Sequence, residues 1–67
     1  MGIVKVIEVI AESRDSWEEA AQNAINEASK TIKNIQSIYI KDFKASVKDN
    51  EIEKYLVIAK VSFQVKD

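Results

Sequence analysis

Hydrophobic and polar positions repeat with different periods along the 67-residue chain, and each period predicts one element. Residues 3–11 form a near-continuous run rich in Val and Ile, which suits a strand buried on much of both faces. Residues 38–47 and 55–66 alternate at every second position, as strands with one buried face do. Asp49 and Asn50 lie between these two segments and favour a tight turn, so the sequence predicts a long β-hairpin.

Between the first strand and this hairpin, the apolar positions are spaced by three and four, which indicates a helix. Ser16 followed by Glu19 matches a capping box and places the first helical residue at Trp17. The apolar stripe consists of Trp17, Ala20, Ala21, Ala24, Ile25, Ala28, Ile32 and Ile35. Lys30 and Lys33 are expected to complement the helix dipole near its end. Because the middle of the stripe is almost all alanine, the helix can approach a sheet closely.

The element order is therefore β-α-β-β. A crossover through the helix makes the first two strands parallel, and the third strand, antiparallel to its hairpin partner, fits between them. We predict an α+β fold in a single domain spanning residues 1–67, with a three-stranded antiparallel sheet of order 1-3-2 and one helix on one face. The other face is expected to present four apolar side chains that burial between subunits would remove from water. These are Leu56, Ile58, Ile38 and Ile40.

Composition removes most familiar chemistries, because the chain contains no Cys and no His. Disulfides, Cys/His zinc sites, thiol nucleophiles and histidine catalysis are excluded. Ser and Thr therefore lack a histidine base, and we expect no enzymatic activity. A domain of this length buries only about 60% of the surface that its unfolded chain exposes, so self-association is the expected source of further stability.

Charge and hydropathy also argue against two classes of partner. Ten basic and eleven acidic residues give a net charge of -1, without the clustered basic excess of a nucleic-acid-binding protein. The apolar run at residues 3–11 carries two charges and is far shorter than the roughly 20 residues of a membrane-spanning helix. It also lacks the features of a secretory signal. We expect a cytoplasmic protein that binds neither nucleic acid nor membranes.

Four segments in the same order resemble the dodecins, a family of small β-α-β-β proteins that assemble as hollow dodecamers. They are residues 4–10, 13–21, 28–35 and 55–63, and the resemblance covers essentially the whole chain. It implies a homododecamer that binds, stores or buffers a small ligand. A purely structural or protein-interaction oligomer of the same architecture is the alternative, and a small enzyme with a borrowed cofactor is a third hypothesis.

Flavin-binding dodecins resemble one another in a Trp that stacks on the isoalloxazine ring and a Gln that hydrogen-bonds it. The positions that correspond here are Ser37 and Leu56, and two positions that are often basic near the flavin correspond to Lys44 and Gln64. The resemblance therefore implies a site for riboflavin or FMN at these four residues. We expect the affinity to be weak or lost, because stacking contributes about 1–3 kcal/mol and Leu offers no hydrogen bond.

The chain is more similar to the dodecin branch that lacks this Trp, which includes members described as calcium-binding. Carboxylate oxygens suit calcium or magnesium, and the candidate ligands are Asp42 and, second, Glu53. A symmetric assembly can bring one Asp42 carboxylate from each subunit to an axis, whereas solvated turn charges are the other explanation for Glu53. Trp17, Tyr39 and Tyr55 are interpreted as packing residues or cross-strand partners.

Overall fold

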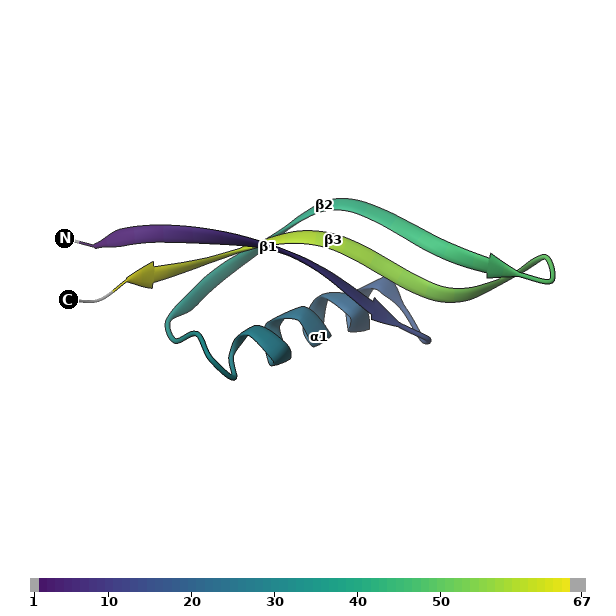
Figure 1. The fold of residues 1–67 in the computed structure, drawn as a ribbon, viewed down its shortest axis with the longest axis horizontal. Coiled ribbons are helices and arrows are strands. Elements are labelled where there is room, and N and C mark those ends of the chain that lie inside the picture. The colour runs from purple at the N-terminus through teal and green to yellow at the C-terminus, as the bar shows by residue number, and fades with distance from the viewer. Residues whose placement is uncertain (1, 66–67) are drawn as a thin grey trace.

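The computed structural model describes residues 2–65 and has the predicted β-α-β-β order (Figure 1). The elements are β1 (Ile3–Ser13), α1 (Trp17–Ala28), β2 (Ile35–Lys48) and β3 (Glu51–Val65). The sheet order is β1-β3-β2 with both pairs antiparallel, and α1 covers one face, which confirms the predicted fold class. Residues 1, 66 and 67 of the predicted domain, including Lys66 of the predicted third strand, lie outside the described residues.

The start of α1 is at the predicted residue, but only half of the predicted capping box forms. The backbone N–H of Glu19 donates to Ser16 Oγ at 3.0 Å, as the motif requires. The Glu19 carboxylate does not return to Ser16, because it accepts a 2.6 Å hydrogen bond from Ser13 Oγ. Ser13 is buried at the end of β1 and also accepts from the backbone N–H of Asp15. The cap thus ties the helix to the strand before it.

The end of α1 differs from the prediction, which extended the apolar stripe to Ile35. The helix ends at Ala28, and Ile35 is the first residue of β2. Asn34 has a φ of 64°, in the left-handed region, because the chain reverses there to return to the sheet. Lys30 and Lys33 therefore lie beyond the last helical turn, and Lys30 forms an ion pair with Glu27 at 3.1 Å.

The core is thin and consists of the alanine face of α1 packed against the middle of β3. Val57, Ala59 and Val61 are fully buried, as the alternation in the third strand predicted. Ala20, Ala24 and Ala28 of α1 are also buried, with no side chain beyond Cβ to hold the layers apart. Within residues 2–65, Val57 and Val61 are the largest side chains that are fully buried. A single chain therefore removes little apolar surface from water.

An irregularity in β2 overturns the predicted facing of Ile38 and Ile40. Ile38 pairs with Val61 and Ile40 with Ala59, so both isoleucines lie on the helix side of the sheet. The register shifts between Ile40 and Asp42, which leaves Lys41 as an extra residue. Such a bulge reverses the alternation, so the strict period of two assigned every residue before Lys41 to the wrong face.

The β2–β3 hairpin projects beyond the helix as an arm (Figure 1). Asp49 and Asn50, the predicted turn, both have positive φ, as expected for a two-residue loop that matches the twist of the strands. Trp17 anchors the base of this arm: its Nε1 donates to the Lys44 carbonyl at 2.9 Å, and its ring packs edge-on to Tyr55 with centroids 4.8 Å apart. The packing interpretation of these two aromatic residues is thus confirmed.

Candidate functional site

The sheet face that α1 does not cover, called the open face here, carries all four positions of the implied flavin pocket. Cross-strand pairing places Ser37 opposite Ser62, Lys44 opposite Leu56 and Val4 opposite Gln64. Leu56, Ser62 and Gln64 alternate with the buried residues of β3, so their side chains point away from the helix. Their cross-strand partners point the same way. No site residue is buried in the core.

The four positions form two groups and not one. Lys44 and Leu56 are direct neighbours, and Ser37 lies near Gln64 at the other end of β3. Ser62 lies six positions after Leu56 in β3, which corresponds to about 20 Å along the strand. A pocket built from all four positions therefore requires more than one chain.

Polar side chains that are hydrogen-bonded to each other occupy the end of the open face near Ser37. The hydroxyls of Ser37 and Ser62 form a hydrogen bond, and Gln36 Nε2 donates to Gln64 Oε1 at 3.1 Å. This ladder offers no flat apolar surface for an isoalloxazine ring, and Leu56 offers its edge no polar atom. The residues present do not fit the flavin contacts that the family resemblance implies.

Tyr39 is an exposed aromatic residue on the same face that the sequence reasoning did not treat as a site. It lies two residues after Ser37, pairs with Lys60 and leaves 64% of its surface exposed. Lys60 in turn faces Glu8, whose carboxylate pairs with Lys41 Nζ at 3.4 Å. The spacing of two between Ser37 and Tyr39 indicates that they share a face, but the unrecognised bulge at Lys41 led to Tyr39 being assigned to the helix side of the sheet.

The two candidate ion ligands are also far apart on one chain. Asp42 lies on the open face opposite Ile58, whereas Glu53 is the extra residue at a second register shift near the tip of the arm. Ile58 lies five positions after Glu53 in β3, which corresponds to about 17 Å along the strand. The described part of the chain contains no group of three or more potential metal ligands. Neither carboxylate is therefore joined by two further acidic ligands from the described part of its own chain.

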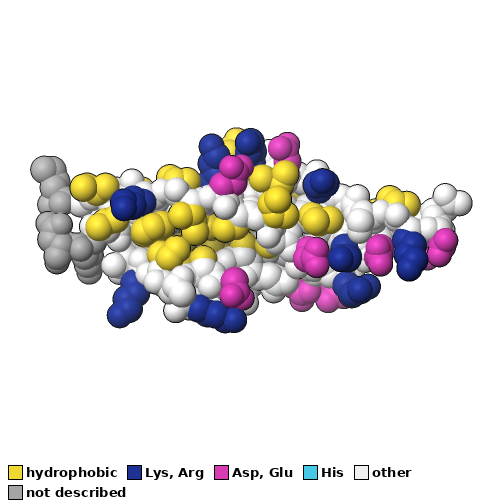
Figure 2. Space-filling model, viewed as in Figure 1, with side chains coloured by type: hydrophobic (Ala, Val, Ile, Leu, Met, Phe, Trp, Pro, Cys, Tyr) yellow, Lys and Arg dark blue, Asp and Glu magenta, His cyan; other side chains and the backbone are white. Residues whose placement is uncertain are grey.

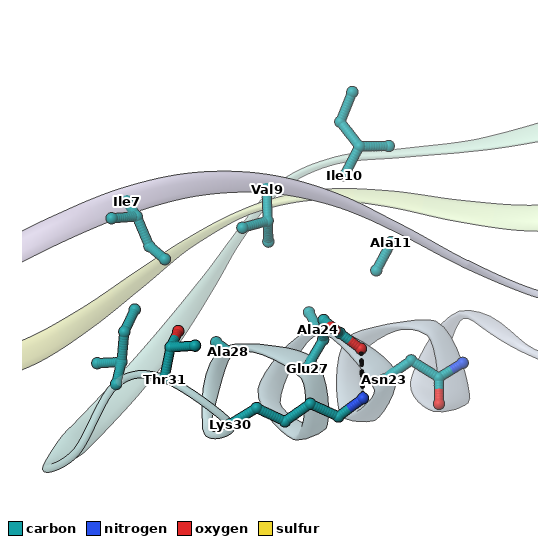
Figure 3. A pocket seen from close by; sticks show the side chains of 11 residues that line it. Ile7, Val9, Ile10, Ala11, Asn23, Ala24, Glu27, Ala28, Lys30 and Thr31 are labelled. Carbon is teal, nitrogen blue, oxygen red and sulfur yellow. Dashed lines mark hydrogen bonds and ion pairs between the residues drawn. The ribbon is translucent and has the colours of Figure 1, made fainter.

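An apolar groove of about 460 Å³ lies between the edge strand β1 and the C-terminal half of α1. Ile7, Val9 and Ala11 point toward the helix from β1, and the Glu27–Lys30 ion pair lies at the helix surface (Figure 3). Figure 2 shows apolar side chains gathered in this hollow, with charged side chains around it.

None of the helices in residues 2–65 is long and apolar enough to span a membrane.

Comparison with known proteins relates this sequence and geometry to one family. The family model described as Dodecin matches residues 3–66. A dodecin mutant from T. thermophilus matches with a TM-score of 0.95 at 22% identity, covering 100% of both chains. The Streptomyces coelicolor dodecin gives 0.95 at 23% identity, covering 98% of this chain and 94% of its own.

A third solved structure is a calcium dodecin from Mycobacterium tuberculosis, described as calcium-chelating with a novel calcium-binding site. It matches with a TM-score of 0.83 at 29% identity, covering 96% of this chain and 91% of its own. No curated protein matches the sequence significantly.

Proposed function

The chain belongs to the dodecin family, and from this premise we propose that it assembles into a hollow homododecamer that binds or stores a small ligand. The observation that carries the proposal is the family match, because it covers residues 3–66 and so almost the whole of the sequence. The absence of Cys and His supports binding over catalysis.

The shape of the single chain supports the proposed assembly. Its radius of gyration is 13.7 Å, whereas a compact chain of this length has about 11 Å. Val4, Val6 and Ile10 are more than half exposed on the open face. Apolar side chains exposed in this number on so small a chain are typical of a surface that a partner covers.

The mass of the protein in solution tests the assembly. Twelve chains of 7.6 kDa give about 91 kDa, which static light scattering distinguishes from smaller species. A stable monomer or dimer at micromolar concentration contradicts the proposal. Mass analysis of ligands released from the purified assembly then separates a storage protein from the alternative, a purely structural or protein-interaction oligomer.

We further propose that flavin is not the ligand to which this assembly is adapted. Riboflavin and FMN are expected to bind with dissociation constants in the micromolar range or weaker, because Ser37 cannot stack and Leu56 cannot hydrogen-bond. Titration followed by quenching of flavin fluorescence measures this. Nanomolar affinity in the unmodified protein would contradict the proposal.

A double substitution tests the assignment of these positions. Ser37→Trp with Leu56→Gln is expected to tighten riboflavin binding by two or more orders of magnitude, since it adds a stacked ring and a hydrogen bond. Tyr39→Trp with Leu56→Gln is the matched control, because it places the ring one pleat away on the same face. Equal gains in both variants would show that Ser37 does not occupy the stacking position.

Divalent cations are the second candidate ligand. The calcium dodecin is the most identical of the solved structures reported above, and Asp42 places a carboxylate on the open face. Calcium and magnesium favour sites made only of oxygen atoms, which repeated carboxylates of a symmetric assembly can supply.

A further inference from the structure

A row of three side chains crosses the middle of the open face, with one residue from each strand. Glu8 of β1 pairs with Lys60 of β3, and Lys60 pairs with Tyr39 of β2. Residues directly opposite each other in an antiparallel sheet point to the same face and lie within reach of one another. The three side chains therefore lie side by side with Lys60 in the centre, and they are called the cross-sheet row here.

The bulge in β2 brings a second lysine to this row. Lys41 is the extra residue between Ile40 and Asp42, and its Nζ lies 3.4 Å from Glu8 Oε2, on the far side of the central strand. Bulges can re-aim a side chain in this way. The Glu8 carboxylate is thus paired with Lys41, although Lys60 is its direct cross-strand neighbour.

Lys60 consequently keeps an exposed ammonium group that forms no ion pair with any of residues 2–65. Asp42 is the next carboxylate on this face by register, opposite Ile58, and it is not paired with Lys60 either. Because the charges of Lys41 and Glu8 cancel, the cross-sheet row carries one unbalanced positive charge. Such a charge favours an anionic group in a ligand.

Tyr39 supplies an aromatic surface beside this charge. It leaves 64% of its surface exposed, and the ring contacts of the described residues lie elsewhere, where Trp17 packs on Phe43 and Tyr55. An exposed ring can stack on a planar ligand, while a neighbouring ammonium group binds an acidic substituent of the same ligand. The pair of Tyr39 and Lys60 therefore suits an aromatic anion.

The surface around Tyr39 is short. The hydroxyl pair of Ser37 and Ser62 bounds it on one side, and the ion pair of Lys41 and Glu8 bounds it on the other. Ser37 and Lys41 lie four positions apart, or about 13 Å along β2, and Tyr39 is the aromatic side chain between them. This length suits a single ring with its substituent better than the longer fused-ring system of a flavin.

We propose that the cross-sheet row binds a small aromatic carboxylate, with the ring of the ligand stacked on Tyr39 and its carboxylate at Lys60 Nζ. The inference rests on the small-ligand binding proposed above and names the class of ligand. One unbalanced positive charge matches the single negative charge of a carboxylate, whereas a phosphate monoester carries about 1.5 to 2 negative charges. The pairing of Glu8 with Lys41 reduces the repulsion that Glu8 would exert on the ligand.

Salicylate, one ring with one carboxylate, is the probe that tests the proposal. Equilibrium dialysis against the intact protein, read by salicylate fluorescence, is expected to give a dissociation constant below about 1 mM. Salicylamide has the ring without the charge, and cyclohexanecarboxylate, measured by competition, has the charge without the aromatic ring. Each should bind at least about fivefold more weakly than salicylate.

Substitutions in the row locate the binding. Lys60→Gln and Tyr39→Leu should each weaken salicylate binding about three- to tenfold, whereas Tyr39→Phe keeps the ring and should retain it. Lys5→Gln is the matched control, because Lys5 is an exposed lysine of the same sheet that pairs with Phe63 on the helix side. Circular dichroism and light scattering check that each variant keeps the fold and mass of the unmodified protein.

Two results overturn the proposal: salicylate binding no tighter than that of salicylamide, or binding that Lys60→Gln and Tyr39→Leu leave unchanged. Because the row lies on one chain, binding is measured whatever the mass of the protein. A full-sized assembly that does not bind salicylate therefore contradicts the ligand class alone. A protein that fails to assemble contradicts the proposed homododecamer, even where salicylate binds as expected.

Discussion

Two carboxyl groups meet at the start of α1. A hydrogen bond with Glu19, and next the negative charge of Glu19, raise the pKa of Asp15 above its ordinary value of 3.8. A carboxyl group whose pKa is raised in the folded state binds its proton more tightly there than in the unfolded chain. Its stabilising effect is complete below the unfolded pKa and is lost as the pH rises through the folded pKa.

Asp15→Asn is therefore expected to raise the thermal midpoint at pH 7, because it removes the repulsion from Glu19 while keeping a polar side chain. The gain should shrink as the pH falls below 3.8. Thermal unfolding at both pH values measures it. Glu18→Gln, which removes an acidic charge from the same helical turn, is the control for charge alone. An equal gain for both variants would show that no specific pair exists.

At the scale of elements, the N-cap is the best-defined local interaction of α1. Ser16→Ala removes the acceptor for the Glu19 N–H and should cost about 1 kcal/mol. The thermal midpoint should fall by about 4–8 °C, and Ser16→Asn should restore most of it. Loss of stability in both variants would point instead to the neighbouring Ser13 network.

Sequence patterns predicted these elements to different degrees, for physical reasons. The start of α1 and the hairpin turn depend on local chemistry, Ser16 at the cap and Asp49–Asn50 at positive φ, so they could be predicted. Ile32 and Ile35 continue the helical spacing although the helix ends at Ala28, because Ile32 lines the groove after the helix and Ile35 is the first residue of β2. The bulge at Lys41 escaped prediction because the apolar ring of Tyr39 allowed a strict period of two to continue from residue 39 to residue 47.

The candidate site was less predictable than the fold because its parts are far apart on one chain. The family resemblance could name Ser37 and Leu56, and carboxylate chemistry could name Asp42, but neither could say which of these residues meet. Their separation along β3 means that the assembly and not the protomer decides which residues form one pocket.

At the scale of the whole molecule, an ion bound only by the assembly must stabilise it by mass action. If Asp42 carboxylates gather at a symmetry axis, millimolar calcium should raise the thermal midpoint and EDTA should lower it. Asp42→Ala should abolish both effects without preventing folding, whereas Glu53→Ala should abolish them only if the ion binds at the arm. A midpoint that neither calcium nor EDTA changes would leave both residues as solvated charges.

The position of β3 in the centre of the sheet also governs how the protein is made. Ile3 pairs with Val65, so β1 has no strand partner until nearly all of the described chain has left the ribosome. The apolar run of β1 therefore stays unpaired while the ribosome synthesises α1, β2 and the turn that follows. Pairing over such sequence separations is slow and exposes the chain to aggregation. Chaperone capture during synthesis should therefore concentrate on residues 3–11, well before any subunit contact can form.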